Sequence, residues 1–400
     1  MSNWSKVTLG EVAALVSEKI DVARLTRESY ISTENMNPNR GGVVSAEKLP
    51  PFGRTNAFLV GDTLFSNIRT YFKKVWLSNI TGGASADVLV FRATSNGKLE
   101  SAFLYYLLSS DTFIDSTITA SKGTKMPRGD KEAMLRYSFE LPPLPVQRRI
   151  AGILSAYDAL MENSQQRIRH LEAMARALYR EWFVHFRFPG HEKHPCVACS
   201  LGDIPQGWEV KRVPECVDIN PRVVVPRDGE KPFVPMGCLS KDSILITDLE
   251  SRDGNSGAKF QNGDTLLARI TPCLENGKTG FVQFLPDAKA AACGSTEFIV
   301  LRSRTLTPEF VYLLARSDEF RGVAIKSMSG ATGRQRVQEQ CFDDFQIAQP
   351  TRALLDQFSA IVAPSFRLIH KLHLQIQNLR RTRDLLLPRL LSGQVNLKDN

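Results

Sequence analysis

The fold is decided by residues 150–182, which read IAGILSAYDALMENSQQRIRHLEAMARALYREW. Mostly apolar side chains recur there at alternating intervals of four and three residues. They are Ile150, Leu154, Tyr157, Met161, Ser164, Ile168, Leu171, Ala175, Leu178 and Trp182. This spacing places them along one narrow seam of an α-helix, the pattern of helices that pack as a coiled coil. Because the outer face is polar, for example at Glu162 and Arg169, the seam predicts a partner helix and no large core.

The same seam recurs 208 residues later, in the stretch FSAIVAPSFRLIHKLHLQIQNLRRTRDLLLPRL at 358–390. Arg383 puts a charge in this second seam, Pro364 is expected to kink or restart the helix, and Pro388 to disturb its end. We therefore expect two long helices, within 143–186 and 351–400, that pair as an antiparallel coiled coil. Two ordinary amphipathic core helices are the alternative. The length of more than four heptads and the polar outer faces argue against that alternative.

The rest of the chain also repeats once, at shifts between 202 and 210 residues. Four segments recur in the same order: Trp4–Glu11 as Trp208–Glu215, Gly61–Leu64 as Gly263–Leu266, Ser85–Arg92 as Ser295–Arg302, and Phe103–Phe113 as Phe310–Phe320. In each copy a Gly-Asp-Thr-Leu turn enters a strand, a short buried strand follows, and the Phe-x-Tyr segment reads as one amphipathic helix. The fold class is therefore α+β, with similar mixed domains at 1–142 and 208–350 and a linker at 187–207.

The charge balance points to a polyanionic partner. The 400 residues carry a formal net charge of +9, and nucleic acid is the usual partner of such a basic chain. Seven cysteines without a spacing framework indicate reduced thiols. The start of the chain lacks a signal-peptide core, and apolar runs fall far short of the ~20 residues that cross a bilayer. We expect a cytoplasmic protein with no membrane partner.

The connectivity predicts how the helices separate the two domains. The first helix leads through the linker into the second domain, and the second helix starts at the far side of that domain. An antiparallel pair with one domain at each end satisfies this order. A seam of 33 residues is about 50 Å long at ~1.5 Å per residue. The two domains would then be held apart by more than one DNA turn of ~34–36 Å.

Three sequence patterns imitate catalytic or metal sites. Residues 272–279 end like a phosphate-binding loop, but Pro272 replaces the first glycine and strand residues follow instead of a helix. His191, His194, Cys196 and Cys199 are suitable zinc ligands, although a solvated linker is the favoured interpretation. The stretch 141–144, Leu-Pro-Pro-Leu, superficially resembles the Asn/Asp-Pro-Pro-aromatic motif of amino-methyltransferases, but it lacks both the polar and the aromatic residue. It is interpreted as the end of the first domain. We expect no catalytic residues, no metal and no cofactor in this chain.

DNA reading needs cations for phosphates and Arg, Lys, Asn or Gln side chains for base edges. In the first copy such residues surround Tyr71 and Phe72 and flank Gly123. They are Asn67, Arg69, Lys73, Lys74, Lys122, Lys125 and Arg128. The second-copy candidates are Arg269, Lys278, Arg334, Gln335 and Arg336. Each one taken alone is equally well explained as a solvated surface residue; the hypothesis concerns the set.

Taken together, the residues resemble the specificity (S) subunit of type I restriction-modification enzymes over essentially the whole chain. The resemblance rests on five pieces in order: the duplicated opening at Trp4–Glu11, Gly-Asp-Thr-Leu, Ser121–Thr124, Pro142–Gln147 before the long helix, and the closing Leu386–Gly393. The second copy departs from the pattern at Met328–Thr332 and Pro350–Ala353, which weakens the transfer of residue roles there.

The resemblance implies two target-recognition domains that each read one half of a bipartite DNA site. The helices would measure the unspecified spacer and dock two methyltransferase subunits, and restriction translocase-nuclease subunits would complete the assembly. S-adenosylmethionine, ATP and Mg²⁺ would belong to those partners. The complex would then be an adenine-type DNA methyltransferase and ATP-dependent endonuclease, while this subunit is non-catalytic.

Other functions stay open on sequence grounds. A subunit of a methylation-only system has the same sequence features. A coiled-coil adaptor that binds proteins through its basic surface would show no sequence-dependent affinity for duplex DNA. An enzyme of another kind would show turnover by the isolated chain.

Overall fold

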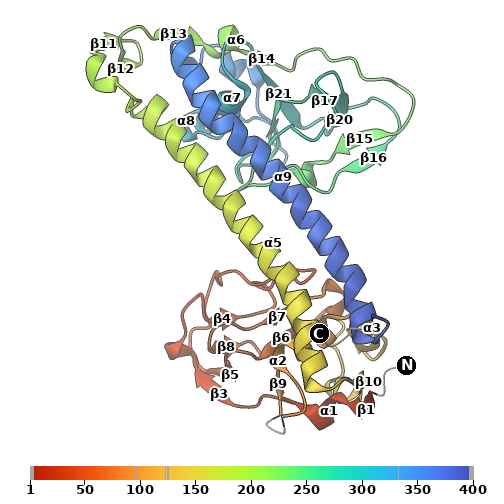
Figure 1. The fold of residues 1–400 in the computed structure, drawn as a ribbon. Helices are drawn as coiled ribbons and strands as arrows, with labels where there is room; N and C mark the ends of the chain where they lie inside the picture. Colours follow the sequence, from red (N-terminus) through yellow and green to blue (C-terminus); the bar gives the residue numbers. More distant parts are fainter. Residues whose placement is uncertain (1–3, 95–96, 122, 124–125, 332, 396–400) are drawn as a thin grey trace. The chain divides into compact units, whose positions relative to one another are not determined.

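The computed structural model describes residues 4–94, 97–121, 123, 126–331 and 333–395 (Figure 1). The chain divides into two compact units, both of mixed α+β structure as the sequence predicts. Unit 1 consists of residues 1–161 together with 377–400, and unit 2 of residues 162–376. Among the described residues, no helix is both long and apolar enough to cross a bilayer.

Unit 1 contains two four-stranded sheets and a two-stranded ribbon. The first sheet is antiparallel, in the order β2 (Ala13–Leu15), β9 (Val88–Ala93), β6 (Thr63–Ser66), β7 (Val75–Leu77). The second runs β3 (Lys19–Asp21), β5 (Arg54–Phe58), β8 (Gly82–Ala84), β4 (Tyr30–Ile31), and its β4–β8 pair is parallel. The ribbon joins β1 (Ser5–Thr8) to β10 (Ser138–Leu141). The strands expected after Gly-Asp-Thr-Leu and at 88–91 are β6 and β9.

Unit 2 repeats this plan with one difference. Its first sheet has the matching order β14 (Val217–Ile219), β21 (Phe298–Ser303), β18 (Thr265–Ala268), β19 (Thr279–Phe281). Its second runs β16 (Glu250–Arg252), β15 (Lys231–Val234), β20 (Ala291–Gly294), β17 (Ala258–Gln261), with β15–β20 parallel. The ribbon pairs β13 (Glu209–Arg212) with β22 (Gln346–Gln349). The fourth strand of the second sheet therefore sits at opposite edges in the two units.

The expectation of one amphipathic helix in each Phe-x-Tyr segment is wrong. Unit 1 has α2 (Ser101–Ser109) and α3 (Asp111–Thr119), and unit 2 has α7 (Pro308–Ala315) and α8 (Asp318–Lys326). The break falls at Ser110 and Ser317, whose side chains accept hydrogen bonds from the Phe113 and Phe320 amides. A serine that caps the next helix ends the previous one. The repeated Ser-Asp pair is the sequence signal of this break.

Both predicted long helices are present. They are α5 (Leu144–Tyr179), which continues in a π-helical turn at Arg180–Val184, and α9 (Arg352–Leu391). α9 is continuous through Pro364 and Pro388, so the expectation that the helix restarts at Pro364 is wrong. Both prolines lie on the exposed face, so the carbonyl that each leaves without an amide donor can bind water instead.

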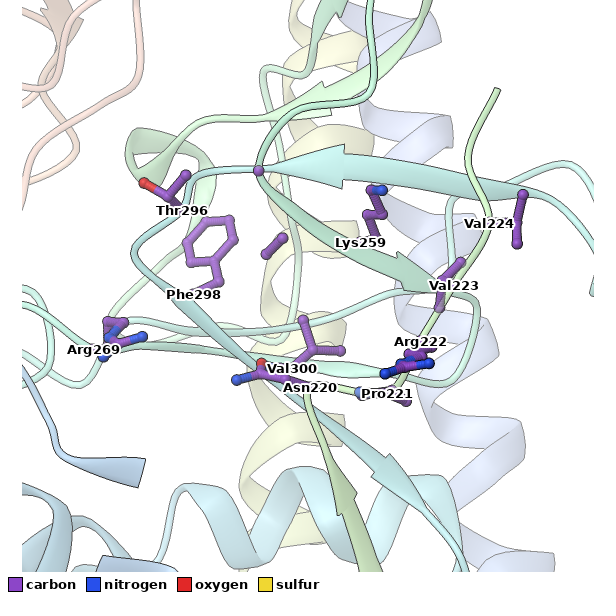
Figure 2. A pocket seen from close by; sticks show the side chains of 12 residues that line it. Asn220, Pro221, Arg222, Val223, Val224, Lys259, Arg269, Thr296, Phe298 and Val300 are labelled. Atoms are coloured by element: carbon purple, nitrogen blue, oxygen red, sulfur yellow. The ribbon is translucent and has the colours of Figure 1, made fainter. Parts of the chain in front are cut away.

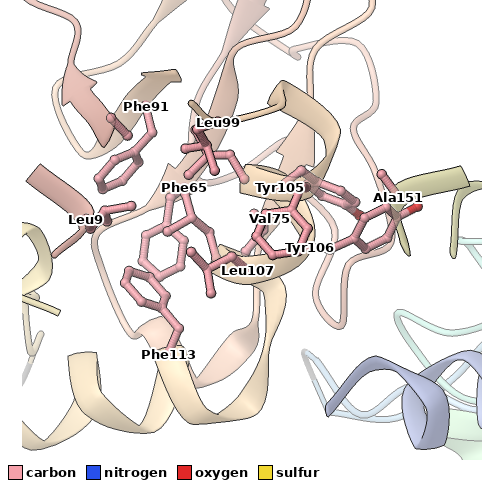
Figure 3. Close-up of a cluster of buried hydrophobic side chains, with 14 of the residues drawn as sticks. Leu9, Phe65, Val75, Phe91, Leu99, Tyr105, Tyr106, Leu107, Phe113 and Ala151 are labelled. Carbon is pink, nitrogen blue, oxygen red and sulfur yellow. The ribbon is translucent and has the colours of Figure 1, made fainter. Parts of the chain in front are cut away.

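In unit 1 the two helices share one hydrophobic core with the first sheet. Figure 3 shows part of this core, with Ala151 of α5 beside side chains such as Phe65 and Phe91. Ile150 and Leu154 of α5 and Leu387 and Leu390 of α9 are buried in the cluster that also holds Phe65, Phe91 and Phe113. The charge at Arg383 is compensated there. Its guanidinium lies 2.5 Å from an Asp158 oxygen and 2.9 Å from an Asp384 oxygen.

In unit 2 the helices meet through aromatic rings. The Phe183 ring lies 4.8 Å from those of Phe358 on α9 and Phe310 on α7. The predicted solvated linker is partly wrong, since Phe188 is buried and stacks on Trp208 at 5.6 Å. The linker also forms a hairpin of β11 (Cys196–Cys199) and β12 (Gly202–Pro205). Packing of Phe188 attaches this segment to unit 2.

The Gly-Asp-Thr-Leu motif has a structural role in both units. Asp62 accepts two hydrogen bonds from Arg92, each at 2.7 Å, and Asp264 accepts two from Arg302 at 2.7 and 2.6 Å. Each aspartate also caps its own turn, through the amide of Leu59 or Gln261. The motif therefore binds the start of β6 or β18 to the neighbouring central strand.

Candidate nucleic-acid interface

In unit 1 the structure brings the two predicted basic loops together. A β-bridge joins Ile68, after β6, to Arg128. The Arg69 amide donates to the Pro127 carbonyl at 3.0 Å, and the Gly129 amide donates to the Asn67 carbonyl at 3.1 Å. These backbone bonds fix the loop after β6 against the loop that precedes α4 (Lys131–Leu135). We call this pair of loops, with its counterpart in unit 2, the two-loop surface.

Unit 2 builds the two-loop surface with equivalent bonds. Ile270 and Arg336 form the β-bridge. The Thr271 amide donates to the Gln335 carbonyl at 3.0 Å, and the Val337 amide donates to the Arg269 carbonyl at 2.9 Å. Residues that lie 58 or more positions apart in the sequence are thus held side by side in the same way in both units.

Among the candidates of unit 1 that the structure describes, Arg69 and Arg128 are exposed. Arg69 has a left-handed backbone conformation, with φ of 50°. The Arg128 side chain is 60% exposed and forms an ion pair with Asp87 at 2.9 Å. Tyr71 and Phe72 lie between the basic residues with ring centroids 4.7 Å apart, and both are exposed. Cations beside exposed aromatic rings suit contact with a nucleic acid.

Three other candidates of unit 1 are less accessible. Asn67 is buried, at 6% exposure. The Lys73 ammonium lies 2.8 Å from an Asp111 oxygen, and Lys74 is half-buried beside the Thr33 carbonyl. Burial lowers the pKa of the Lys74 ammonium. The predicted contacts Lys122 and Lys125 lie outside the described residues.

Arg334 and Arg336 are the exposed cations of the unit 2 surface. Arg336 lies 2.6 Å from a Glu297 oxygen, and this hydrogen bonding lowers the pKa of the Glu297 carboxyl. The Arg336–Glu297 pair is the counterpart of Arg128–Asp87. Gln335 is half-buried. A surface arginine held by one carboxylate is oriented in advance, and it can exchange that partner for a base or phosphate.

The remaining unit 2 candidates serve partly as internal supports. Arg269 pairs with Glu339 at 2.8 Å and donates to the Val337 carbonyl at 3.2 Å. Lys278 donates to the Met236 carbonyl at 3.1 Å. Lys278 corresponds in position to Lys74. The Lys74 carbonyl accepts a hydrogen bond from the Ser66 amide of β6, and the Lys278 carbonyl accepts one from the Ala268 amide of β18. Arg269 and Lys278 therefore stabilise the conformation of the loop, in addition to giving it positive charge.

Sequence reasoning missed the residues that support the two-loop surface in unit 1. The Arg40 side chain is 7% exposed and binds Asp111 at 2.7 Å and Asp384 of α9 at 3.4 Å. Its amide donates to the Lys73 carbonyl at 2.9 Å. Arg40 therefore connects the basic loop to the end of α9 that belongs to unit 1. No repeated motif marks this segment.

Unit 2 supports its surface with the opposite charge. Glu172 of α5 is buried and accepts hydrogen bonds from the Ser243 hydroxyl at 2.5 Å and the Ile244 amide at 2.9 Å. The same segment bonds to β19, because the Phe281 amide donates to the Ile244 carbonyl at 3.0 Å. In unit 1, α9 is thus linked through Arg40 to the loop after β6. In unit 2, α5 is linked through Ile244 to β19, which follows the loop after β18.

The suspected zinc ligands are not arranged around a metal. Cys196 and Cys199 lie on β11, and His191 contacts the Phe188 carbonyl at 2.9 Å. Within the part of the chain that the structure describes, no group of three or more His, Cys, Asp or Glu side chains is placed to hold a metal ion. Residues 272–279, which end like a phosphate-binding loop, lead into strand β19. A phosphate-binding loop would instead lead into the N-terminus of a helix.

The chain is similar to known proteins in sequence and in fold. Residues 1–173 match the model of a family described as type I restriction modification DNA specificity domain. The chain is 25% identical to the MjaIX specificity subunit of Methanocaldococcus jannaschii, over 75% of this chain and 70% of that one. It is 21% identical to the HindI specificity subunit of Haemophilus influenzae, over 99% and 100%. A crystal structure of a type I restriction-modification S subunit from M. genitalium has the same fold, with a TM-score of 0.55 at 12% identity over 97% of this chain and 96% of that one.

Proposed function

Because the chain belongs to the family of type I restriction-modification specificity subunits, we propose that it selects the DNA site at which a restriction-modification complex acts. Units 1 and 2 each read one half of a bipartite site. The chain carries out no chemistry itself. It reads the DNA site, positions the partner subunits on that site and holds the complex together.

The two-loop surface is the observation that carries this proposal. It occurs once in each unit, with equivalent backbone bonds and an exposed arginine at the same place, Arg128 or Arg336. A backbone arrangement that is repeated in both units, with different side chains on each copy, suits the reading of two different short sequences. Its loops approach a duplex with cations and planar donor groups, which recognise phosphates and base edges.

We further propose that α5 and α9 form an antiparallel pair that sets the gap between the half-sites. This is supported by the division of each helix between the units. Unit 1 holds residues 144–161 and 377–391, and unit 2 holds residues 162–179 and 352–376. In each unit the two helices pack together in the interior, so each end of the helix pair is fixed to one unit.

The helices are also the proposed docking surface for two methyltransferase subunits, and translocase-nuclease subunits would join that complex. S-adenosylmethionine, ATP and Mg²⁺ would bind to those partners in the cytoplasm. The polar outer faces of both helices support a docking role, because only the narrow seam is needed for the pair itself.

Mapping of methylated sites tests the proposed function. Co-expression of the chain with methyltransferase subunits is expected to methylate one bipartite motif, with two short fixed sequences and a single gap length. Nucleotide-resolution sequencing of genomic DNA reads this directly. Methylation at one uninterrupted motif, or the same methylation without the chain, would contradict the proposal.

Arg128→Ala and Arg336→Ala are each expected to weaken binding to the cognate duplex. If the arginine reads a base, its loss costs about 1–3 kcal/mol and relaxes the preference at that position. Fluorescence anisotropy with the assembled methyltransferase complex measures the effect. Arg136→Ala is the matched control, because Arg136 is 70% exposed at the C-terminal end of α4 and pairs with Glu132 one helical turn away. Wild-type affinity in both variants would remove these loops from the interface.

A further inference from the structure

The two units differ at one sheet edge next to the two-loop surface. In unit 1, β3 follows β2 and covers the outer edge of β5, where the Ala57 amide also donates to the Glu18 carbonyl at 2.8 Å. In unit 2, residues 220–226, which follow β14 as β3 follows β2, form no strand. Strand β17, the counterpart of β5, therefore remains at the edge of its sheet.

A groove lies where the covering strand is missing (Figure 2). Its volume is about 660 Å³, and it runs between the segment 220–224 and β17. Phe298 and Val300 form an apolar floor, and Arg222, Lys259 and Arg269 contribute three cations to the lining. None of the lining residues is acidic.

Two of these three cations are available to a ligand. Arg269 is neutralised by Glu339, which also accepts a hydrogen bond from the Asn220 side chain at 2.8 Å. Arg222 is exposed and Lys259 is half-buried. Among the described residues, neither of them forms an ion pair. The groove therefore presents uncompensated positive charge along its open side.

The position of the groove indicates its occupant. Arg269 belongs both to the groove lining and to the two-loop surface. Thr296 of the lining directly precedes Glu297, which holds Arg336. A polyanion bound at the two-loop surface of unit 2 would thus continue into the groove. Charge complementarity favours a sugar-phosphate backbone over a protein strand added to β17, since a peptide gains little from two unpaired cations.

We propose that this groove is a phosphate-backbone site for the DNA that flanks the half-site of unit 2, with Arg222 and Lys259 as the phosphate contacts. This inference rests on the proposed function. It makes the two domains unequal: unit 2 grips the backbone in a groove that β3 closes in unit 1. Phosphate contacts add affinity and salt dependence but carry no sequence information.

The test compares two double variants of the chain in complex with its methyltransferase subunits. One is Arg222→Ala with Lys259→Ala. The control is Lys193→Ala with Lys289→Ala, which removes the same charge from exposed positions of unit 2 outside the groove. Equilibrium binding is measured from 50 to 300 mM salt on a cognate and a scrambled duplex, and thermal unfolding verifies that both variants fold.

The groove variant is expected to bind both duplexes on the order of 10- to 100-fold more weakly near 100 mM salt. Its plot of log affinity against log salt should be shallower by about 2, because each neutralised phosphate contributes roughly 0.9 to that slope. Its methylated motif should stay the same.

Three results would overturn the inference. The groove variant could bind like the control while the wild-type complex binds DNA normally. It could change the motif, which would make the groove a base reader. It could bind DNA fully but lose subunit assembly, which would place a protein strand on β17. A wild-type complex that binds no duplex at all would instead refute the proposed function.

Discussion

Arg302→Ala is expected to destabilise unit 2 by about 3–5 kcal/mol, the usual cost of leaving a buried charge without its partner. The Asp264 side chain is 1% exposed, and Arg302 donates two hydrogen bonds to it. Arg302→Ala removes both of these charge-assisted hydrogen bonds from a carboxylate that is almost fully buried. The same argument applies to Arg92→Ala in unit 1, where Asp62 is 3% exposed.

Hydrogen exchange measures this loss within one unit of the full chain. Amides of β18 and β21 should exchange roughly two to three and a half orders of magnitude faster in Arg302→Ala, at about 1.4 kcal/mol per tenfold. Arg304→Ala is the control. Arg304 is exposed two residues further on, with a weak 3.4 Å contact to the Pro214 carbonyl, and its loss should stay within about 0.5 kcal/mol. Equal effects of the two substitutions would show that the Gly-Asp-Thr-Leu motif is not held by its arginine.

The sequence predicts the periodic and repeated features of this fold well. A seam at intervals of four and three is a local property, so it identifies α5 and α9 without knowledge of their neighbours. The repeat likewise locates β6, β9, β18 and β21, because the same buried positions recur in order. The sequence expectations that the structure contradicts also come from local features. Pro364 leaves α9 intact since its face is exposed, and the Ser-Asp pairs end helices that the apolar spacing alone would continue.

Long-range pairing explains what the sequence does not predict. The addition of β3 to β5 in unit 1, and its absence in unit 2, depends on contacts between segments without a shared motif. The candidate site shows the same limit. Composition directs attention to both basic loops, but only the fold reveals that Asn67 is buried and that Lys73 pairs with Asp111. It also reveals that Arg222 forms no ion pair with any residue that the structure describes.

Lengthening both helices together is expected to lengthen the gap in the recognised site. Three extra copies of the heptad 162–168 in α5 and of 370–376 in α9 add 21 residues to each helix while keeping the two seams in register. At ~1.5 Å per residue the pair grows by about 32 Å, close to one DNA turn. The two-loop surfaces are unchanged, so both half-site sequences should be retained.

The same insertion in α5 alone is the control. It gives the two helices unequal lengths, and the seam residues of the pair can no longer meet at both ends. This variant is expected to lose methylation of the bipartite site. If it methylated as well as the doubly lengthened chain, the helices would not act as a pair.

The most direct measurement is therefore the gap length itself, mapped at nucleotide resolution in genomes that express the wild-type chain or the doubly lengthened one. A ruler of paired helices predicts that the two short motifs stay the same and that the gap grows by about nine or ten base pairs, at ~3.4 Å per base pair. An unchanged gap in the lengthened chain would contradict it, because the spacing of the half-sites would then be set by something other than α5 and α9.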